Sequence, residues 1–118
     1  MWNIEITDEF FDWWNTLSVS EQDDLQVGIE LLESNGPSLV RPHADTVKGS
    51  RHPNMKELRT QSAGKPLRSF FAFDPRRSAI LLIGGDKTGD KRFYDKMIPL
   101  ADALYDAYLK EIRKEGLI

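Results

Sequence analysis

Three short strand-like segments follow one another closely in the second half of the chain, and they constrain the fold more than any other feature. Residues 55–59 alternate apolar and polar side chains, residues 67–73 are rich in phenylalanine, and residues 78–83 are apolar almost throughout. These patterns are typical of β-strands, and the last one predicts a central strand. Turn residues at 64–66 and 74–77 leave only short connections, so we expect an antiparallel meander.

The first forty residues predict one strand and two helices. Residues 2–6 alternate like a half-buried strand, which we expect to join the same sheet. Thr7 or Asp8 is placed to cap the first helix, and Ser18 or Ser20 the second. A Gly-Pro pair then ends the second helix.

The remainder predicts a long loop and a final helix. Residues 37–54 contain three prolines and few large apolar side chains, and we expect a loop there with a short strand near Val47. Asp90 is placed to cap a helix that continues through Tyr108. Pro99 interrupts this helix, which we expect to kink or restart there.

The order of these elements predicts an α+β fold in one domain spanning residues 1–118. We expect a mostly antiparallel four-stranded sheet with the two N-terminal helices on one face, followed by the C-terminal helix. The aromatic cluster around Trp13 and Trp14 then belongs to the core, although an exposed member of it could dock a partner.

Opposite charges occupy different parts of the chain. Residues 1–40 contain nine acidic and no basic side chains, whereas residues 41–96 contain thirteen basic and six acidic ones. The net charge of −3 alone argues against a nucleic-acid partner. The segregation, however, indicates an anionic partner for the basic part. The alternative is that two oppositely charged layers attract each other within one domain.

Several chemistries are excluded by what the chain lacks. Without cysteine there is no disulfide, thiolate metal site or thiol nucleophile. His43 and His52 have no metal-binding spacing, and Gly84-Gly85 is not followed by the pattern of a phosphate-binding loop. No apolar run is long enough to span a membrane, and the first nine residues carry no basic segment of the kind that opens a signal peptide. We therefore expect a cytoplasmic protein that uses no metal or cofactor.

The residues left for chemistry are mostly basic and lie in or just after the predicted sheet. Alternation places Lys56 with Leu58 on one face of their strand, and Glu57 with Arg59 on the other. Arg68 lies in an otherwise apolar strand, where a charge is avoided unless it is paired or used. A functional role would explain Arg68, and so would a salt bridge to Glu57 or to the acidic helices.

The motifs of this region have a characteristic order along the chain. They are a Lys-Gly turn at 48–49, a Glu-Leu-Arg strand at 57–59, an Arg-containing apolar strand at 67–73, an apolar strand at 79–83 and a Lys-Thr turn at 87–88. This order and spacing resembles the phage Gp49/HigB branch of the RelE toxin superfamily, over residues 1–110. The resemblance implies a RelE-like fold and the toxin of a type II toxin-antitoxin system, which cleaves mRNA in the ribosomal A site. It also implies a small antitoxin partner, often a helix-turn-helix protein.

The resemblance assigns residues, with two departures. Arg59 matches the arginine of the Glu-Leu-Arg strand, and Arg68 matches the arginine of the next strand. The family's Lys-Lys-Thr turn has Asp86 in place of its first lysine, so Lys91 or Arg92 is expected to supply the second cation. An aromatic residue usual in that turn is here glycine, and Tyr94 is a candidate for the tyrosine that some relatives use.

Metal-free RNA cleavage uses the neighbouring 2′-OH, which attacks phosphorus and leaves a 2′,3′-cyclic phosphate and a 5′-OH. We expect Arg59 and Arg68 to bind the phosphoryl group, because a guanidinium matches its oxygens. A lysine among other cations releases its proton readily, so Lys56 or Lys87 is the expected base, and Tyr94 or Lys87 the acid. The residues expected to bind RNA around them are Lys48, Arg51, Lys91 and Arg92.

Two other readings stay open. The protein could be a non-catalytic module whose basic sheet holds RNA or an acidic protein. It could also be a phage-derived structural component or an antitoxin-binding domain without nuclease activity, which the acid at Asp86 favours. Convergence of Arg59, Arg68 and Lys87 on one phosphate-sized cavity would favour the nuclease, whereas scattered or fully paired cations would favour plain binding.

Overall fold

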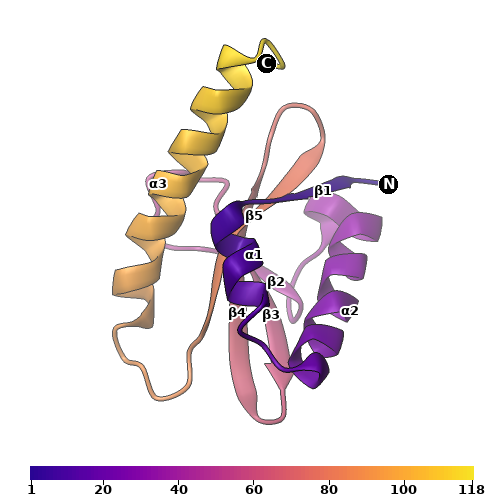
Figure 1. Ribbon diagram of the computed structural model, residues 1–118, viewed down its shortest axis with the longest axis vertical. Coiled ribbons are helices and arrows are strands. Elements are labelled where there is room, and N and C mark those ends of the chain that lie inside the picture. The colour runs from indigo at the N-terminus through magenta and orange to yellow at the C-terminus, as the bar shows by residue number, and fades with distance from the viewer.

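The computed structural model describes residues 1–118 and places a mixed sheet between helices on its two faces (Figure 1). The strands are β1 (Asn3–Ile6), β2 (Ala44–Thr46), β3 (Lys56–Ser62), β4 (Lys65–Phe73) and β5 (Ser78–Asp86). The helices are α1 (Asp8–Trp14), α2 (Val19–Asn35) and α3 (Phe93–Lys114), with a short 3-10 turn, η1 (Gly36–Ser38), after α2. None of the helices is both long and apolar enough to span a bilayer.

The sheet has five strands in the order β1-β5-β4-β3-β2, so the expectation of four strands is wrong. The meander of β3, β4 and β5 is confirmed as antiparallel, and β1 joins its edge by pairing parallel with β5. The additional strand is β2, which pairs antiparallel with β3 just before Val47. Three residues are too few to show a period, so the sequence could indicate this strand only loosely.

Hydrogen bonds to nearby side chains cap the N-termini of α1 and α2, and a glycine follows α2, as the sequence predicted. The Thr7 hydroxyl accepts a hydrogen bond from the Phe10 backbone N–H and caps α1. Ser18, rather than Ser20, caps α2 in a reciprocal capping box with Glu21. Gly36 follows with a φ of 54°, a left-handed conformation that glycine adopts without strain.

The C-terminal helix differs from its prediction at its first residues, and it does not restart at its proline. It begins at Phe93 with Arg92 at the N-cap position. The Asp90 carboxylate instead accepts a hydrogen bond from the Arg92 backbone N–H. It runs through Pro99 without a restart and continues to Lys114. Pro99 is exposed, so the carbonyl that loses its intrahelical donor can be hydrated, and helix packing is maintained on the opposite side.

The hairpin between β3 and β4 turns at Ala63-Gly64, one residue earlier than the expected turn. Both residues have positive φ, 48° and 81°, which is typical of a two-residue turn that matches strand twist. Pro66 consequently lies inside β4, where it pairs with Gln61.

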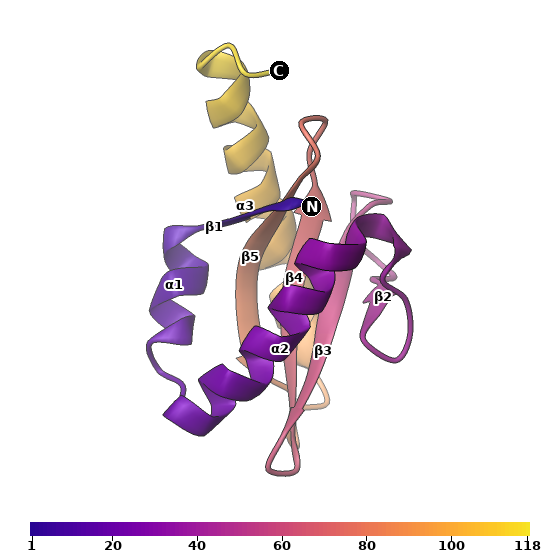
Figure 2. The ribbon, with the colours of Figure 1, turned by 90° about the vertical axis from the view of Figure 1, so that its right-hand side faces the viewer.

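The two faces of the sheet have separate cores, one under α1 and α2 and the other under α3 (Figures 1 and 2). Phe71 belongs to the α1/α2 core and Phe70 to the α3 core, as strand alternation requires. Gly84 and Gly85 allow close helix packing on both faces, because a Cβ would overlap Trp13 at the first position and crowd Phe93 at the second. The two N-terminal helices therefore share one face, as predicted, and α3 covers part of the other.

The capping box predicts a stability difference between two neighbouring serines. Ser18→Ala removes the cap of α2 and should lower the free energy of unfolding by about 1 kcal/mol. Ser20→Ala, at an exposed position inside the first turn, should change it by less than about 0.5 kcal/mol. Urea unfolding of the two variants and the parent measures both values, and equal losses would contradict the assignment of Ser18 as the cap.

Candidate functional site

One open cavity of about 420 Å³ collects side chains from the β2 region, β3, the β5–α3 turn and the first turn of α3. Its charged members are four cations and two carboxylates, so it is net cationic. The lining residues are Arg41, Asp45, Thr46, Val47, Lys48, Glu57, Arg59, Lys87 and Tyr94. Strand alternation and the turn after β5 bring these distant parts of the sequence to one face of the sheet.

The buried carboxylate of Glu57 organises this cavity. Its side chain is only 5% exposed, and its Oε1 accepts a hydrogen bond of 2.6 Å from the Tyr94 hydroxyl. The same oxygen lies 3.2 Å from Arg68 Nε, and Oε2 lies 3.8 Å from an Arg59 guanidinium nitrogen. Glu57 therefore links β3, β4 and α3, and the sequence had indicated it only as a salt-bridge partner.

Arg59 and Arg68 face each other across β3 and β4, a pairing that the alternation within each strand left open. Their like charges are tolerated because Glu57 lies between them and Asp45 Oδ2 is 3.5 Å from Arg59. Arg68 is 11% exposed and also donates to the Leu67 carbonyl, whereas Arg59 is 33% exposed and reaches the cavity. The salt bridge that offered an alternative explanation for Arg68 is thus present.

Of the predicted catalytic cations that line the cavity, Arg59 is paired with carboxylates and Lys87 is not. Its Nζ lies 5.3 Å from the centre of the Tyr94 ring, and its backbone N–H donates to the Pro66 carbonyl. The side chain is half-buried at the cavity wall. An ammonium held against an aromatic face and free of carboxylates is suited to receive an anion.

Several other predicted residues lie elsewhere. Lys56 is on the α1/α2 side of β3 because it shares that face with Leu58, so it does not line the cavity with Arg59. Arg51 is engaged with Asp106 and Asp102 of α3. Of the predicted RNA-binding residues, Lys48 lines the cavity, whereas Lys91 and Arg92 are exposed in the turn before α3 and do not line it.

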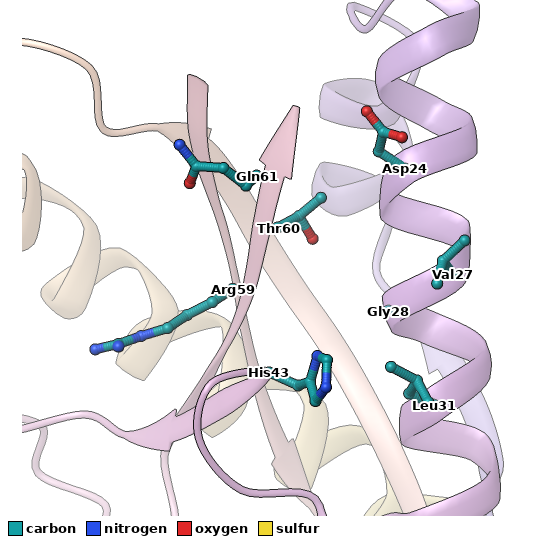
Figure 3. A pocket seen from close by; sticks show the side chains of 8 residues that line it. All are labelled: Asp24, Val27, Gly28, Leu31, His43, Arg59, Thr60 and Gln61. Atoms are coloured by element: carbon teal, nitrogen blue, oxygen red, sulfur yellow. The ribbon is translucent and has the colours of Figure 1, made fainter. Parts of the chain in front are cut away.

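A second groove lies between α2 and the C-terminal half of β3, and it shows how alternation directs neighbouring β3 side chains to opposite faces (Figure 3). The Arg59 guanidinium points away from α2, whereas its neighbour Thr60 points toward that helix. The groove also includes His43 and Asp24. It shares only Arg59 with the cationic cavity.

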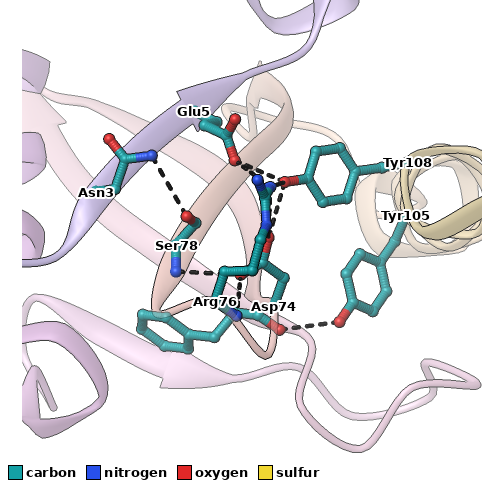
Figure 4. A network of polar contacts seen from close by, with 8 residues as sticks. Asn3, Glu5, Asp74, Arg76, Ser78, Tyr105 and Tyr108 are labelled. Atoms are coloured by element: carbon teal, nitrogen blue, oxygen red, sulfur yellow. Dashed lines mark hydrogen bonds and ion pairs between the residues drawn. The ribbon is translucent and has the colours of Figure 1, made fainter. Parts of the chain in front are cut away.

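A polar network holds α3 in position over the sheet (Figure 4). The Tyr108 hydroxyl is 2.6 Å from Glu5 and 2.9 Å from Asp74, and Arg76 donates to both carboxylates. Burial favours the neutral form of Asp74, but hydrogen bonds from Tyr108 and Arg76 outweigh it and hold the pKa of Asp74 below its usual value. Because α3 also carries Tyr94, this network helps to place the cavity's phenol.

The environment of Tyr94 determines its protonation. Burial and the hydrogen bond to Glu57 both disfavour the phenolate, and they raise the pKa of Tyr94 above its ordinary value. Tyr94 therefore remains a proton donor at neutral pH. No group of three or more His, Cys, Asp or Glu side chains has an arrangement that could hold a metal ion.

Comparison with known proteins identifies the family. Residues 12–106 match the family model described as "Phage derived protein Gp49-like". The chain belongs to the Gp49-like family. "Putative toxin HigB3" of Mycobacterium tuberculosis (strain ATCC 25618 / H37Rv) is 48% identical over 98 residues, which are 82% of this chain and 84% of that protein. "Putative toxin HigB2" of the same strain is 45% identical over 101 residues, or 84% of this chain, but the match spans only 50% of that longer protein.

Solved structures show that this Gp49-like protein has the RelE fold. The free E. coli RelE toxin, as an arginine-to-alanine double mutant, superposes with a TM-score of 0.58 over 81% of this chain and 94% of RelE. The archaeal RelE–RelB complex of Pyrococcus horikoshii superposes with a TM-score of 0.54 over 75% of this chain and 97% of the matched chain. Identities of 8% and 11% limit these two likenesses to the fold. The RelE/HigB-like toxin family indicated by the sequence is confirmed.

The raised pKa of Tyr94 predicts a specific loss of stability in alkali. The native state holds the phenol proton to a higher pH than the unfolded chain does. The contribution of Tyr94 to the free energy of unfolding is therefore complete below the unfolded pKa near 10, and it is lost as the pH rises toward the native pKa. Tyr94→Phe should remove this contribution, so its free energy of unfolding should fall less steeply than the parent's above about pH 10. Urea unfolding from pH 8 to 11 measures the slopes, and parallel curves would contradict the raised pKa of Tyr94.

Proposed function

We propose that this Gp49-like toxin is an endoribonuclease that cleaves mRNA on the ribosome and is neutralised by a cognate antitoxin. The observation that carries the proposal is the convergence of Arg59, Lys87 and Tyr94 on one cationic cavity, with Arg68 directly behind them. Family membership supports the toxin, and the RelE–RelB complexes among the fold's neighbours support an antitoxin partner. We place its activity in the cytoplasm, where ribosomes and mRNA meet.

The cavity can supply the three functions of metal-free RNA cleavage. Arg59 binds the non-bridging phosphate oxygens, and Lys87, in its uncharged amine form, accepts the proton of the attacking 2′-OH. Tyr94, which stays protonated at neutral pH, donates a proton to the leaving 5′ oxygen. The products are a 2′,3′-cyclic phosphate and a 5′-OH, and exchange with water returns both side chains to their starting states.

Arg68 and Glu57 act as positioning residues in this proposal. Glu57 is buried and Arg68 largely so, and their ion pair holds the Tyr94 hydroxyl and the Arg59 guanidinium at the cavity. Removing either partner leaves a buried charge uncompensated and costs about 3–5 kcal/mol of stability. Variants of Arg68 and Glu57 therefore confound catalysis with folding, which makes Lys87 the better residue to test.

Dependence on the ribosome has a physical reason. The cavity is open, and its Arg59 is already paired with Glu57, so it holds a flexible RNA weakly. A ribosome that fixes the mRNA can supply orientation worth several kcal/mol. The exposed Lys48, Lys91 and Arg92 would meanwhile contact RNA phosphates in a salt-sensitive way.

A non-catalytic binding module is the second candidate function, and the pairing of Arg59 and Arg68 with Glu57 favours it. Ion pairs of this kind also occur in purely structural networks. In this case the cationic cavity would bind RNA or an acidic protein without cleavage. The unpaired Lys87 distinguishes the two candidates, because binding alone tolerates its loss better than catalysis does.

Replacing Lys87 should abolish toxicity. Lys87→Ala should lower cleavage of ribosome-bound mRNA by about 100-fold or more, because it removes a group that contacts the reacting atoms. Lys110→Ala, an exposed lysine of α3 outside the cavity, is the matched control and should arrest growth like the parent. Growth after induction, with and without the candidate antitoxin, and primer extension on the mRNA measure the effect. Full toxicity of Lys87→Ala at equal protein levels would refute the catalytic role.

Naked RNA should be a poor substrate. We expect the purified protein to cut mRNA on programmed ribosomes at least about 100-fold faster than the same RNA free in solution, because the ribosome supplies the orientation. Cleavage rates on the two substrates under identical salt measure the ratio. Equal rates would contradict ribosome dependence, and RNA binding without a cut on either substrate would establish the binding module instead.

A further inference from the structure

An apolar groove lies on the opposite side of the sheet from the cationic cavity, between β1, α1 and α2. It has a volume of about 230 Å³, and seven of its eight lining residues are hydrophobic. Two of these are conspicuously exposed, Phe11 at 51% and Ile6 at 49%. The lining residues are Ile4, Ile6, Phe10, Phe11, Trp14, Gln26, Ile29 and Leu81. A hydrophobic groove with large side chains left in water is typical of an interaction site.

Acidic side chains border this groove on both helices. On α1, Asp8 lies three residues before Phe11, on the same face of the helix as that exposed ring. On α2, Asp23 and Glu30 lie three residues before and four residues after Gln26, on the same helical face. All three acids are exposed, and residues 1–40 contain no lysine or arginine that could offset them.

The shape and the charges together specify the occupant. We propose that this groove binds an amphipathic helix of a protein partner, with large apolar side chains spaced three and four residues apart and flanked by lysine or arginine. The groove volume accommodates only one or two such side chains, as expected for the anchor residues of a helix in a groove. The acidic border attracts the basic flanks and repels both RNA and anionic lipid.

The position of the groove has a consequence for regulation. Helices α1 and α2 form a V on one face of the sheet, with β1 near its open end (Figure 2). Lys87 and Tyr94 line the cavity on the other face, beneath the start of α3. A helix bound between α1 and α2 therefore leaves the cationic cavity open, and the two sites can be occupied together. This inference does not depend on the nuclease proposal.

The test uses two synthetic helical peptides with the same leucine pattern, one flanked by lysines and the other by glutamates. Isothermal titration at low salt should show binding of the lysine-flanked peptide to the parent protein and at least about tenfold weaker binding of the glutamate-flanked one. Phe11→Ser should lower the affinity for the lysine-flanked peptide by at least about tenfold, because it removes an exposed apolar anchor. Val40→Ser, an equally simple change at another exposed apolar residue outside the groove, should change affinity less than twofold.

A second pair of variants tests the charges independently of the apolar contact. Glu30→Lys at the groove should lower the affinity for the lysine-flanked peptide by roughly two- to fivefold. Glu111→Lys, at an exposed position on α3, should leave this affinity unchanged. Circular dichroism and sedimentation of each variant check that it is folded and monomeric. Equal affinity for both peptides, equal effects of Phe11→Ser and Val40→Ser, or a dimer of this chain that covers Phe11 would each overturn the proposal. Loss of cleavage with retained peptide binding would bear only on the nuclease.

Discussion

The buried carboxylate of Glu57 is the interaction on which the α3 side of the molecule depends. A charge with 5% side-chain exposure is tolerated only when it is paired, and Glu57 is paired with two arginines and a tyrosine from three different elements. The reverse also holds, because Arg59 and Arg68 could not face each other across two strands without a negative charge between them. One carboxylate thus allows several cations to remain close together while the cavity keeps a net positive charge.

The sheet separates two surfaces of opposite character. The α1/α2 side presents an apolar groove bordered by acids, and the α3 side presents a cationic cavity. This division explains how a chain with a net charge of −3 can still have a surface suited to RNA phosphates. The expected attraction between opposite charges also operates inside the domain, for example between Lys65 and Glu21. Segregation and internal pairing are therefore both present.

Predictions succeeded where the deciding forces act over a few residues. Thr7 and Ser18 cap their helices through hydrogen bonds that reach only three positions along the chain, so the residue types narrowed each cap to two neighbouring candidates. They were imprecise or wrong where tertiary contacts decide: β2, indicated only as a short strand near Val47, is held by pairing with β3, and α3 continues through Pro99 because its other side packs on the sheet. In the site, alternation already placed Lys56 opposite Arg59, which argued against their sharing one cavity.

The sequence by itself determined the strand meander, the two capped helices and the family, because these depend on local periodicity, short-range capping and the order of motifs. It also determined that Glu57 and Arg59 share a face of their strand, but not that Arg59 and Arg68 face each other. Only the tertiary structure decided that Glu57 lies between them, that Tyr94 donates to it and that Lys87 is left without a carboxylate. The physical reason is that a buried charge selects its partners by distance in space, and the distance between β3 and the start of α3 is set by packing rather than by sequence separation.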